Sequence, residues 1–253
     1  MTEGNAVAVD YSDKFYTERE RRAILSAERV VPVILSYLQP KSVIDVGCGS
    51  GSWCSAFAKN GVPEVLGLDG PWASEHNKDA PFVPFDFATA PLPFQPPLKH
   101  ENYDLAFSVE FAEHVANGRA DAIVDFLTSL APVVVFSAAI PGQGGTGHIN
   151  EQWPDYWVRK FAARDYEACD FLRPLIWNDD QVQSWYRQNV VVYFKGGTPE
   201  QLKQRLAREA LERLRTPMPL VHPVIFHSKL AQRTLRRGAR VFLGRLRRAV
   251  LPS

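Results

Sequence analysis

The chain has 253 residues, which suits one large domain or one domain with appendages. Hydrophobic residues make up 45% of it and charged residues 23%, the balance of a globular protein, so a wholly disordered chain is excluded. The formal net charge of +1 combines −9 over residues 1–212 with +10 over residues 213–253. This asymmetry argues against a protein whose whole surface binds polyanions.

Three features predict the cellular compartment. The sequence has no run of about 18 apolar residues to form a transmembrane helix. Its first residues lack the basic and apolar regions of a signal peptide. The three cysteines are an odd number without the paired spacing of a zinc site. We therefore expect a cytoplasmic protein with reduced thiols.

A helix and a strand open the predicted main domain, which we expect to span residues 18–214 after a lead-in over residues 1–17. Apolar residues recur at three- and four-residue steps between residues 18 and 37, which is the period of an amphipathic helix. The β-branched run at residues 42–46 predicts a buried strand.

A glycine-rich turn, Gly47-Cys-Gly-Ser-Gly51, follows this strand and leads into a predicted helix over residues 53–60. The next predicted strand, residues 64–69, ends on Asp69. Glycines let a ligand approach the backbone closely. An acid at the end of the second strand can accept hydrogen bonds from both hydroxyls of a ribose. Together the two features predict a nucleotide-type cofactor site.

The middle of the chain predicts three more strands, at residues 81–87, 103–108 and 133–139, with a proline-rich loop at 91–98 and a helix at 119–130. Directly after the second of these strands comes Glu110-Phe-Ala-Glu113-His114. At the start of a helix, Glu110, Glu113 and His114 would share one face. Two carboxylates and an imidazole can hold a divalent ion. The alternative is a metal-free helix cap.

A glycine-rich loop at residues 141–148 follows the 133–139 strand at its carboxyl end, where open α/β sheets bind ligands. The loop ends on His148, and Glu151 follows three residues later. An imidazole titrates near neutral pH and suits a general base that removes a hydroxyl proton, with Glu151 to orient it. Two alternatives stay open: His148 completes the metal site, or the loop is purely conformational.

The last elements predicted for the main domain are a helix at residues 153–163, a mixed region at 165–188 with a short helix at 181–187, a strand at 190–195 and a charged helix at 199–213. Strands that alternate with helices imply right-handed crossovers and a mainly parallel sheet.

Prolines near residue 217 mark the start of a basic tail, residues 215–253. Apolar residues recur there at near-helical spacing among arginines, which predicts a basic amphipathic helix. Residues 220–250 would dock on the acidic body of the same or a neighbouring subunit, as in a dimer, or lie on a membrane surface, which would make the protein peripheral at the inner membrane. Nucleic acid is disfavoured because no aromatic platform is interleaved.

The spacing Asp45-x-Gly47-x-Gly49-x-Gly51 differs from the Gly-x-Gly-x-x-Gly of dinucleotide-binding dehydrogenases. It resembles the first motif of class I S-adenosylmethionine-dependent methyltransferases, and residues 67–70, 86–87 and 103–110 resemble later motifs of that family in order. The resemblance implies an α/β fold: a seven-stranded, mostly parallel sheet with an antiparallel last strand and helices on both faces. It implies S-adenosyl-L-methionine as cofactor, bound by Asp45, Gly47, Gly49, Gly51, Asp69, Gly70, Asp86 and Phe87.

The acceptor side resembles two subgroups of that family. The stretch from Glu110 to His114 resembles ubiquinone-pathway O-methyltransferases and small-RNA 3′-terminal 2′-O-methyltransferases. In the latter, such residues and a distant histidine bind a metal, which here implies a divalent cation such as Mg²⁺ at Glu110, Glu113, His114 and His148.

The loop that ends on His148 resembles a broad bacterial group that acts on small molecules or glycans. We therefore expect O-methylation of a sugar, glycan or other small hydroxylated metabolite, with His148 and Glu151 as catalytic residues. One alternative is an RNA 3′-end 2′-O-methyltransferase, against which the acidic body counts. The other is a cofactor-binding adaptor without catalysis.

Overall fold

The computed structural model describes residues 13–75, 80–98, 100, 102–206, 220–222, 225, 226 and 229. The chain divides into two compact units, Met1–Pro219 and Leu220–Ser253. The predicted basic helix of the tail lies almost wholly outside the described residues, as does most of the predicted lead-in. Among the described helices, none has the length and apolar character needed to cross a membrane.

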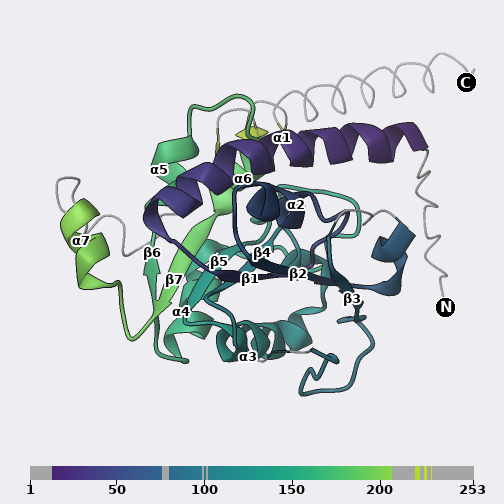
Figure 1. The fold of residues 1–253 in the computed structure, drawn as a ribbon. Helices are drawn as coiled ribbons and strands as arrows, with labels where there is room; N and C mark the ends of the chain where they lie inside the picture. The colour runs from purple at the N-terminus through teal and green to yellow at the C-terminus, as the bar shows by residue number, and fades with distance from the viewer. Residues whose placement is uncertain are drawn as a thin grey trace, which may run out of the picture. The chain divides into compact units, whose positions relative to one another are not determined.

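One sheet of seven strands forms the centre of the first unit, in the order β3-β2-β1-β4-β5-β7-β6 (Figure 1). Strand β7 runs antiparallel to both of its neighbours, and the other pairs are parallel, so the expected fold class is confirmed. The strands are β1 (Ser42–Val46), β2 (Glu64–Asp69), β3 (Phe82–Pro84), β4 (Leu105–Val109), β5 (Val133–Ser137), β6 (Tyr166–Cys169) and β7 (Val191–Lys195).

Helices cover both faces of the sheet (Figure 1). One face carries α1 (Asp13–Tyr37), α2 (Ser52–Lys59), α5 (Leu172–Ile176) and α6 (Ser184–Asn189), and the other carries α3 (Ala120–Leu130) and α4 (Pro154–Ala162). Because side chains alternate along a strand, Val43 and Phe107 belong to the core under α1 and α2, while Ile44 and Ala106 belong to the core above α3 and α4.

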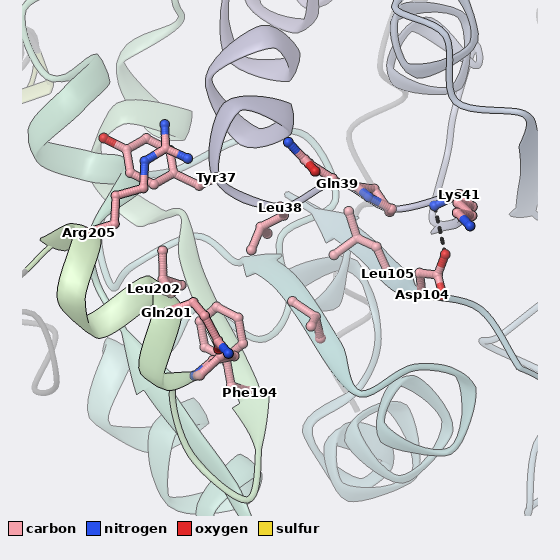
Figure 2. A pocket seen from close by; sticks show the side chains of 13 residues that line it. Tyr37, Leu38, Gln39, Lys41, Asp104, Leu105, Phe194, Gln201, Leu202 and Arg205 are labelled. Atoms are coloured by element: carbon pink, nitrogen blue, oxygen red, sulfur yellow. Dashed lines mark hydrogen bonds between the residues drawn. The ribbon is translucent and has the colours of Figure 1, made fainter.

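A pocket lies at the amino-terminal edge of the sheet, between the end of α1 and α7 (Glu200–Leu206) (Figure 2). Leu105 and Val133, which begin β4 and β5, are among its lining residues. The loops that follow these parallel strands, where the sequence placed its candidate residues, lie at the opposite edge.

Several elements differ from the sequence-based expectation, among them helix α5, which was not predicted. Helix α1 begins at Asp13 and not at residue 18, because its first turns lack apolar periodicity. The strand predicted at 81–87 covers only Phe82–Pro84, at the sheet edge, where it pairs with β2 alone. Strand β6 was not predicted, because a four-residue edge strand carries too short a pattern. The helix predicted at 181–187 lies instead at Ser184–Asn189.

Candidate active site

The glycine-rich turn lies between β1 and α2 at the carboxyl edge of the sheet. Gly47, Gly49 and Gly51 all have positive φ, at 82°, 52° and 76°. At Gly47 a Cβ would also lie 2.3 Å from the ring of Phe111, so the position excludes a side chain on steric grounds as well. A Cβ at Gly49 would meet nothing within 4 Å, which leaves the middle of the turn open to a ligand.

Asp69, the last residue of β2, joins that strand to the turn. Its carboxylate accepts hydrogen bonds from the backbone N–H of Gly49 at 2.7 Å and of Gly70 at 2.6 Å. Burial raises the pKa of Asp69 above its ordinary value, although these two hydrogen bonds act in the opposite direction. Each carboxylate oxygen has a second lone pair, so the acid retains capacity for ribose hydroxyls.

Asp45 is almost fully buried beneath the turn, with Cys54 Sγ donating to its Oδ2 at 3.6 Å. Burial raises the pKa of Asp45 to about 8, against the effect of the Cys54 hydrogen bond, and the nearby charge of Asp69 adds to the rise. At pH 7 the carboxyl is therefore mostly protonated until positive charge approaches it.

Asp86 and Phe87 follow β3 and have different surroundings. Asp86 accepts hydrogen bonds from Thr89 Oγ1 at 2.6 Å and from the N–H of Ala88 at 2.9 Å, and the Thr89 bond contributes most to a lowered pKa. Phe87 is buried in an aromatic cluster, where its ring centroid lies 5.2 Å from that of Phe111. Phe87 therefore packs against Phe111, and the ring of Phe111 in turn lies against Gly47.

Glu110 lies outside any helix, at a φ of 52°, a strained conformation for a residue with a side chain. Its Oε1 accepts hydrogen bonds from Ser137 Oγ at 2.8 Å and Asn189 Nδ2 at 2.9 Å, and its Oε2 accepts one from Gln143 Nε2 at 2.8 Å. Asn189 Nδ2 also donates to Gln143 Oε1 at 2.9 Å. The residues from 110 to 114 thus do not share one helical face, because only Ala112–His114 form a single 3₁₀ turn, η2.

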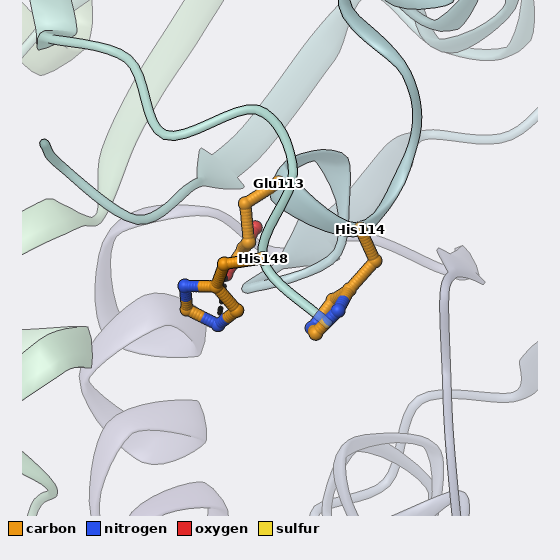
Figure 3. A group of neighbouring side chains, drawn as sticks. All are labelled: Glu113, His114 and His148. Atoms are coloured by element: carbon orange, nitrogen blue, oxygen red, sulfur yellow. Dashed lines mark ion pairs between the residues drawn. The ribbon is translucent and has the colours of Figure 1, made fainter. Parts of the chain in front are cut away.

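Glu113, His114 and His148 form a compact group at the carboxyl edge, in which one ligand atom of each lies within 4.8 Å of the others (Figure 3). Glu110, which the sequence pattern predicted as a fourth ligand, is not part of this group, because its carboxylate is hydrogen-bonded to Ser137, Asn189 and Gln143. The rings of His114 and His148 meet edge to face, with centroids 5.0 Å apart. His148 Nε2 lies 3.9 Å from Glu113 Oε1.

The carboxylate of Glu113 is fully buried, and neither of its oxygens has a hydrogen-bond partner among the residues that the structure describes. Burial raises the pKa of Glu113 well above its ordinary value, and the charge of Glu110 raises it further. An unpartnered buried carboxylate beside two imidazoles is the arrangement that a cation or a proton would stabilise.

Glu151 organises the glycine-rich loop. Its carboxylate accepts hydrogen bonds from the N–H of Gly142 at 2.7 Å and of Gly144 at 2.6 Å, and its Oε1 lies 3.0 Å from His148 Nδ1. Burial favours a higher pKa for Glu151, but these three bonds together lower it below the ordinary value. Because a carboxylate accepts, Nδ1 of His148 is the donor in this pair, which leaves Nε2 as the lone-pair nitrogen of the neutral imidazole.

Backbone hydrogen bonds hold the end of this loop against η2 and against the residues that follow β5. The N–H groups of Ile149 and Asn150 both donate to the carbonyl oxygen of Glu113, at 2.9 and 3.0 Å, and that of Gln152 donates to Ala139 at 3.0 Å. Together with the bonds from Gly142 and Gly144 to Glu151, these bonds fix the chain both before and after His148. Sequence reasoning missed Ser137, Gln143 and Asn189, since nothing in their spacing links them to Glu110.

A family model described as a methyltransferase domain matches residues 17–174, more than half of the chain. No curated protein matches the chain in sequence.

Solved structures share the fold at low sequence identity. The sugar N-methyltransferase of a Streptoalloteichus species is 16% identical with a TM-score of 0.54, over 78% of this chain and 97% of its own. The magnesium protoporphyrin IX methyltransferase of Synechocystis, with bound SAH, is 16% identical with a TM-score of 0.52, over 74% and 90%. A candidate O-methyltransferase from Nostoc punctiforme is 12% identical with a TM-score of 0.53, over 72% of this chain but only 59% of its own.

Proposed function

The chain belongs to the class I methyltransferase family whose model it matches, and on this premise we propose that it transfers a methyl group from S-adenosyl-L-methionine to an oxygen of a sugar, a glycan or another small hydroxylated metabolite. The open glycine turn and the carboxylate of Asp69 support the cofactor assignment, since they offer close backbone approach and acceptors for the ribose hydroxyls.

The electrostatics of the turn also suit this cofactor. S-adenosylmethionine carries a sulfonium and an ammonium group, both positive. Asp45, whose pKa is raised to about 8, and Asp69 lie beside the turn that would receive this end of the molecule. Positive charge stabilises the anionic form of a buried acid, so cofactor binding and deprotonation of Asp45 would be coupled.

The observation that carries O-methylation is the fixed orientation of His148. Glu151 holds Nδ1 as a donor, so Nε2 can accept the hydroxyl proton while the oxygen attacks the methyl carbon. The bond from oxygen to carbon forms as the bond from carbon to sulfur breaks, and S-adenosylhomocysteine leaves. The protein must hold the acceptor oxygen at about 3 Å from the methyl carbon. The anionic Glu151 then stabilises the imidazolium.

A divalent cation is the alternative to the base at this position. Glu113, His114 and His148 would hold it, because the carboxylate of Glu113 and one nitrogen of each imidazole converge there, and Nε2 of His148 would then be a ligand and not the proton acceptor. A bound cation would lower the pKa of an acceptor hydroxyl. Glu110 is not a ligand in this proposal, since Ser137, Asn189 and Gln143 occupy its carboxylate.

Release of S-adenosylhomocysteine tests the proposal, measured over a panel of sugars, polyols and small phenols with and without a chelator. We expect turnover with at least one hydroxyl acceptor and its loss in His148→Ala. The exposed His100 supplies the matched control, and His100→Ala should keep full turnover. Turnover that survives in His148→Ala would contradict the base, and turnover that survives thorough chelation would contradict the cation. Cofactor binding without turnover on any acceptor would favour an adaptor.

A further inference from the structure

The imidazole of His148 rests on the backbone of the glycine-rich loop that leads to it. A Cβ placed on Gly145 would lie 2.2 Å from Nε2 of this ring, 2.5 Å from Cε1 and 2.7 Å from Cδ2. Real Cβ atoms do not approach other atoms so closely, so a side chain at position 145 would displace the ring or the loop. The side chain of His148 is only 10% exposed, which leaves the ring little room to give way.

The three distances also show which part of the ring faces Gly145. A point on the lone-pair axis of Nε2 lies in the ring plane and is therefore much farther from the two neighbouring carbons than from the nitrogen. A point over the ring face lies at similar distances from all three atoms, as the absent Cβ would. Gly145 thus packs on the face of the imidazole beside Nε2, and the lone pair, which lies in the ring plane, stays uncovered by this residue.

One hydrogen bond does not orient this ring by itself. The bond between Nδ1 and Oε1 of Glu151, at 3.0 Å, fixes one ring atom, but the outer torsion of a histidine side chain is broad, so the imidazole can still tilt. Contact of the ring face with Gly145 opposes this tilt. The edge-to-face contact with the ring of His114, at 5.0 Å between centroids, limits it further. The direction of Nε2 therefore depends on a bare backbone surface as well as on Glu151.

The backbone conformation at position 145 does not itself require glycine. Gly142, Gly144 and Gly147 all have positive φ, whereas Gly145 does not. The turns of the loop therefore account for the other three glycines but not for this one. What the chain gains at Gly145 is the absence of a Cβ against the imidazole.

Resting on the proposed function, in which Nε2 of His148 takes the hydroxyl proton, we infer that Gly145 is the positioning residue for this base. Its bare Cα supports the face of the imidazole and sets the direction from which Nε2 accepts the proton. Gly145 does not touch the reacting atoms itself. Because misplacement of a reacting group by about 1 Å can slow a reaction about 10²-fold, a single methyl group at this position should slow methyl transfer.

Nitrogen NMR of the isotope-labelled full chain tests the orientation without any acceptor. Long-range correlations distinguish a protonated from an unprotonated ring nitrogen, and His148→Ala identifies the signals of His148. At pH 8 with a chelator, we expect the wild type to carry the proton on Nδ1 alone. In Gly145→Ala the ring is displaced from Glu151, so both tautomers should appear. Gly118→Ala is the matched control, since φ at Gly118 is not positive and its Cβ would meet nothing within 4 Å, and it should keep the wild-type signals.

Turnover separates a positioning role from a general structural one. With an acceptor that the wild type methylates, kcat in Gly145→Ala should fall about 10²-fold, while the Kd of S-adenosylhomocysteine stays unchanged. Gly118→Ala should alter neither quantity. In a His148→Ala background, Gly145→Ala should have little further effect on kcat, because no imidazole remains to be displaced.

Two results would overturn the role of Gly145. One is a wild-type tautomer in Gly145→Ala, and the other is an equal loss of kcat from Gly145→Ala with and without the imidazole of His148. If the wild type methylates no acceptor, the proposed function fails, and mixed tautomers in Gly145→Ala would still support its role in orienting the ring.

Discussion

Glu151 and His148 form a hydrogen-bonded pair, with Oε1 of the carboxylate 3.0 Å from Nδ1 of the imidazole. The same carboxylate binds two backbone N–H groups of the loop that leads to the histidine. One acidic side chain thus sets both the conformation of the loop and the tautomer of its candidate base.

Removal of the charge on Glu151 should slow methyl transfer without weakening cofactor binding. Glu151→Gln keeps the size of the side chain but not the stabilisation of the imidazolium, so we expect kcat to fall by about 10-fold or more, and His148→Ala to lose about 10²- to 10⁴-fold. Release of S-adenosylhomocysteine under saturating cofactor measures both. An unchanged kcat in Glu151→Gln would show that this charge has no part in the reaction.

The raised pKa of Asp45 predicts a pH dependence of stability. Between its ordinary value of 3.8 and about 8, Asp45 is protonated in the folded protein and ionised in the unfolded chain. Unfolding then releases a proton, so the free energy of unfolding falls as the pH rises through this window, by at most about 1.4 kcal/mol per pH unit.

Urea unfolding at pH 6, 7 and 8 measures this slope. In Asp45→Asn the free energy of unfolding should decrease less steeply with pH than in the wild type, by up to about 1.4 kcal/mol per pH unit. Asp155→Asn, which changes an exposed aspartate, should keep the wild-type slope. Identical slopes in wild type and Asp45→Asn would rule out the buried neutral acid.

Gln143 should contribute strongly to the order of the glycine-rich loop. Gln143→Ala removes hydrogen bonds to Glu110 and Asn189 and leaves Oε2 of the partly buried Glu110 without its partner, which costs about 1–3 kcal/mol of the free energy of unfolding. Amide hydrogens of residues 141–148 should exchange faster in this variant. Gln201→Ala, at an exposed position on α7, should change neither property. Unaltered exchange in Gln143→Ala would mean that the loop is held without this residue.

A divalent cation should raise the thermal stability of the protein in a manner that depends on Glu113. A cation that binds the folded state alone at 100 times its Kd stabilises by about 2.7 kcal/mol. Because the pKa of Glu113 is raised, the cation must displace a proton, and its binding should tighten as the pH rises.

Melting temperatures with and without Mg²⁺ or Mn²⁺, at pH 6 and pH 8, test this expectation. The cation-dependent rise should vanish in Glu113→Gln and persist in Glu64→Gln, whose side chain is 48% exposed. A rise of equal size in Glu113→Gln would exclude this carboxylate as a ligand.

Gly47 and Gly61 have similar φ, so alanine substitutions at the two positions distinguish the cost of backbone strain from the cost of steric overlap. Gly47 and Gly61 have φ of 82° and 88°, but only a Cβ at Gly47 would meet another group, the ring of Phe111. Gly61→Ala should cost about 1–2 kcal/mol from the left-handed conformation alone. Gly47→Ala should cost more and abolish binding of S-adenosylhomocysteine.

Replacing Phe111 tests whether its ring causes the additional loss of stability in Gly47→Ala compared with Gly61→Ala. In a Phe111→Ala background, Gly47→Ala should cost about as much as Gly61→Ala, as measured by urea unfolding. An excess that remains in this background would mean that the ring is not its source.

The sequence by itself determined most of the strands and helices and their order along the chain, but not β6 or α5, and it determined the glycine turn and the acid at the end of β2. Each of these is a local pattern: apolar periodicity, β-branched runs, or glycines at positions where the backbone must turn left-handed. It also placed His148 and Glu151 together, because they are three residues apart.

Only the tertiary structure decided which of the neighbouring acids belongs with the histidines. Glu110 and Glu113 are indistinguishable by spacing, yet a positive φ at Glu110 turns its carboxylate toward Ser137, Gln143 and Asn189, which lie 27 to 79 residues further along the chain. Such partners are set by the packing of β4, β5 and α6 against one another. The indole of Trp72, in the 3₁₀ helix η1 (Pro71–Glu75), likewise lies over Gly70 because of how η1 folds, since sequence specifies a side chain but not the surface on which it rests.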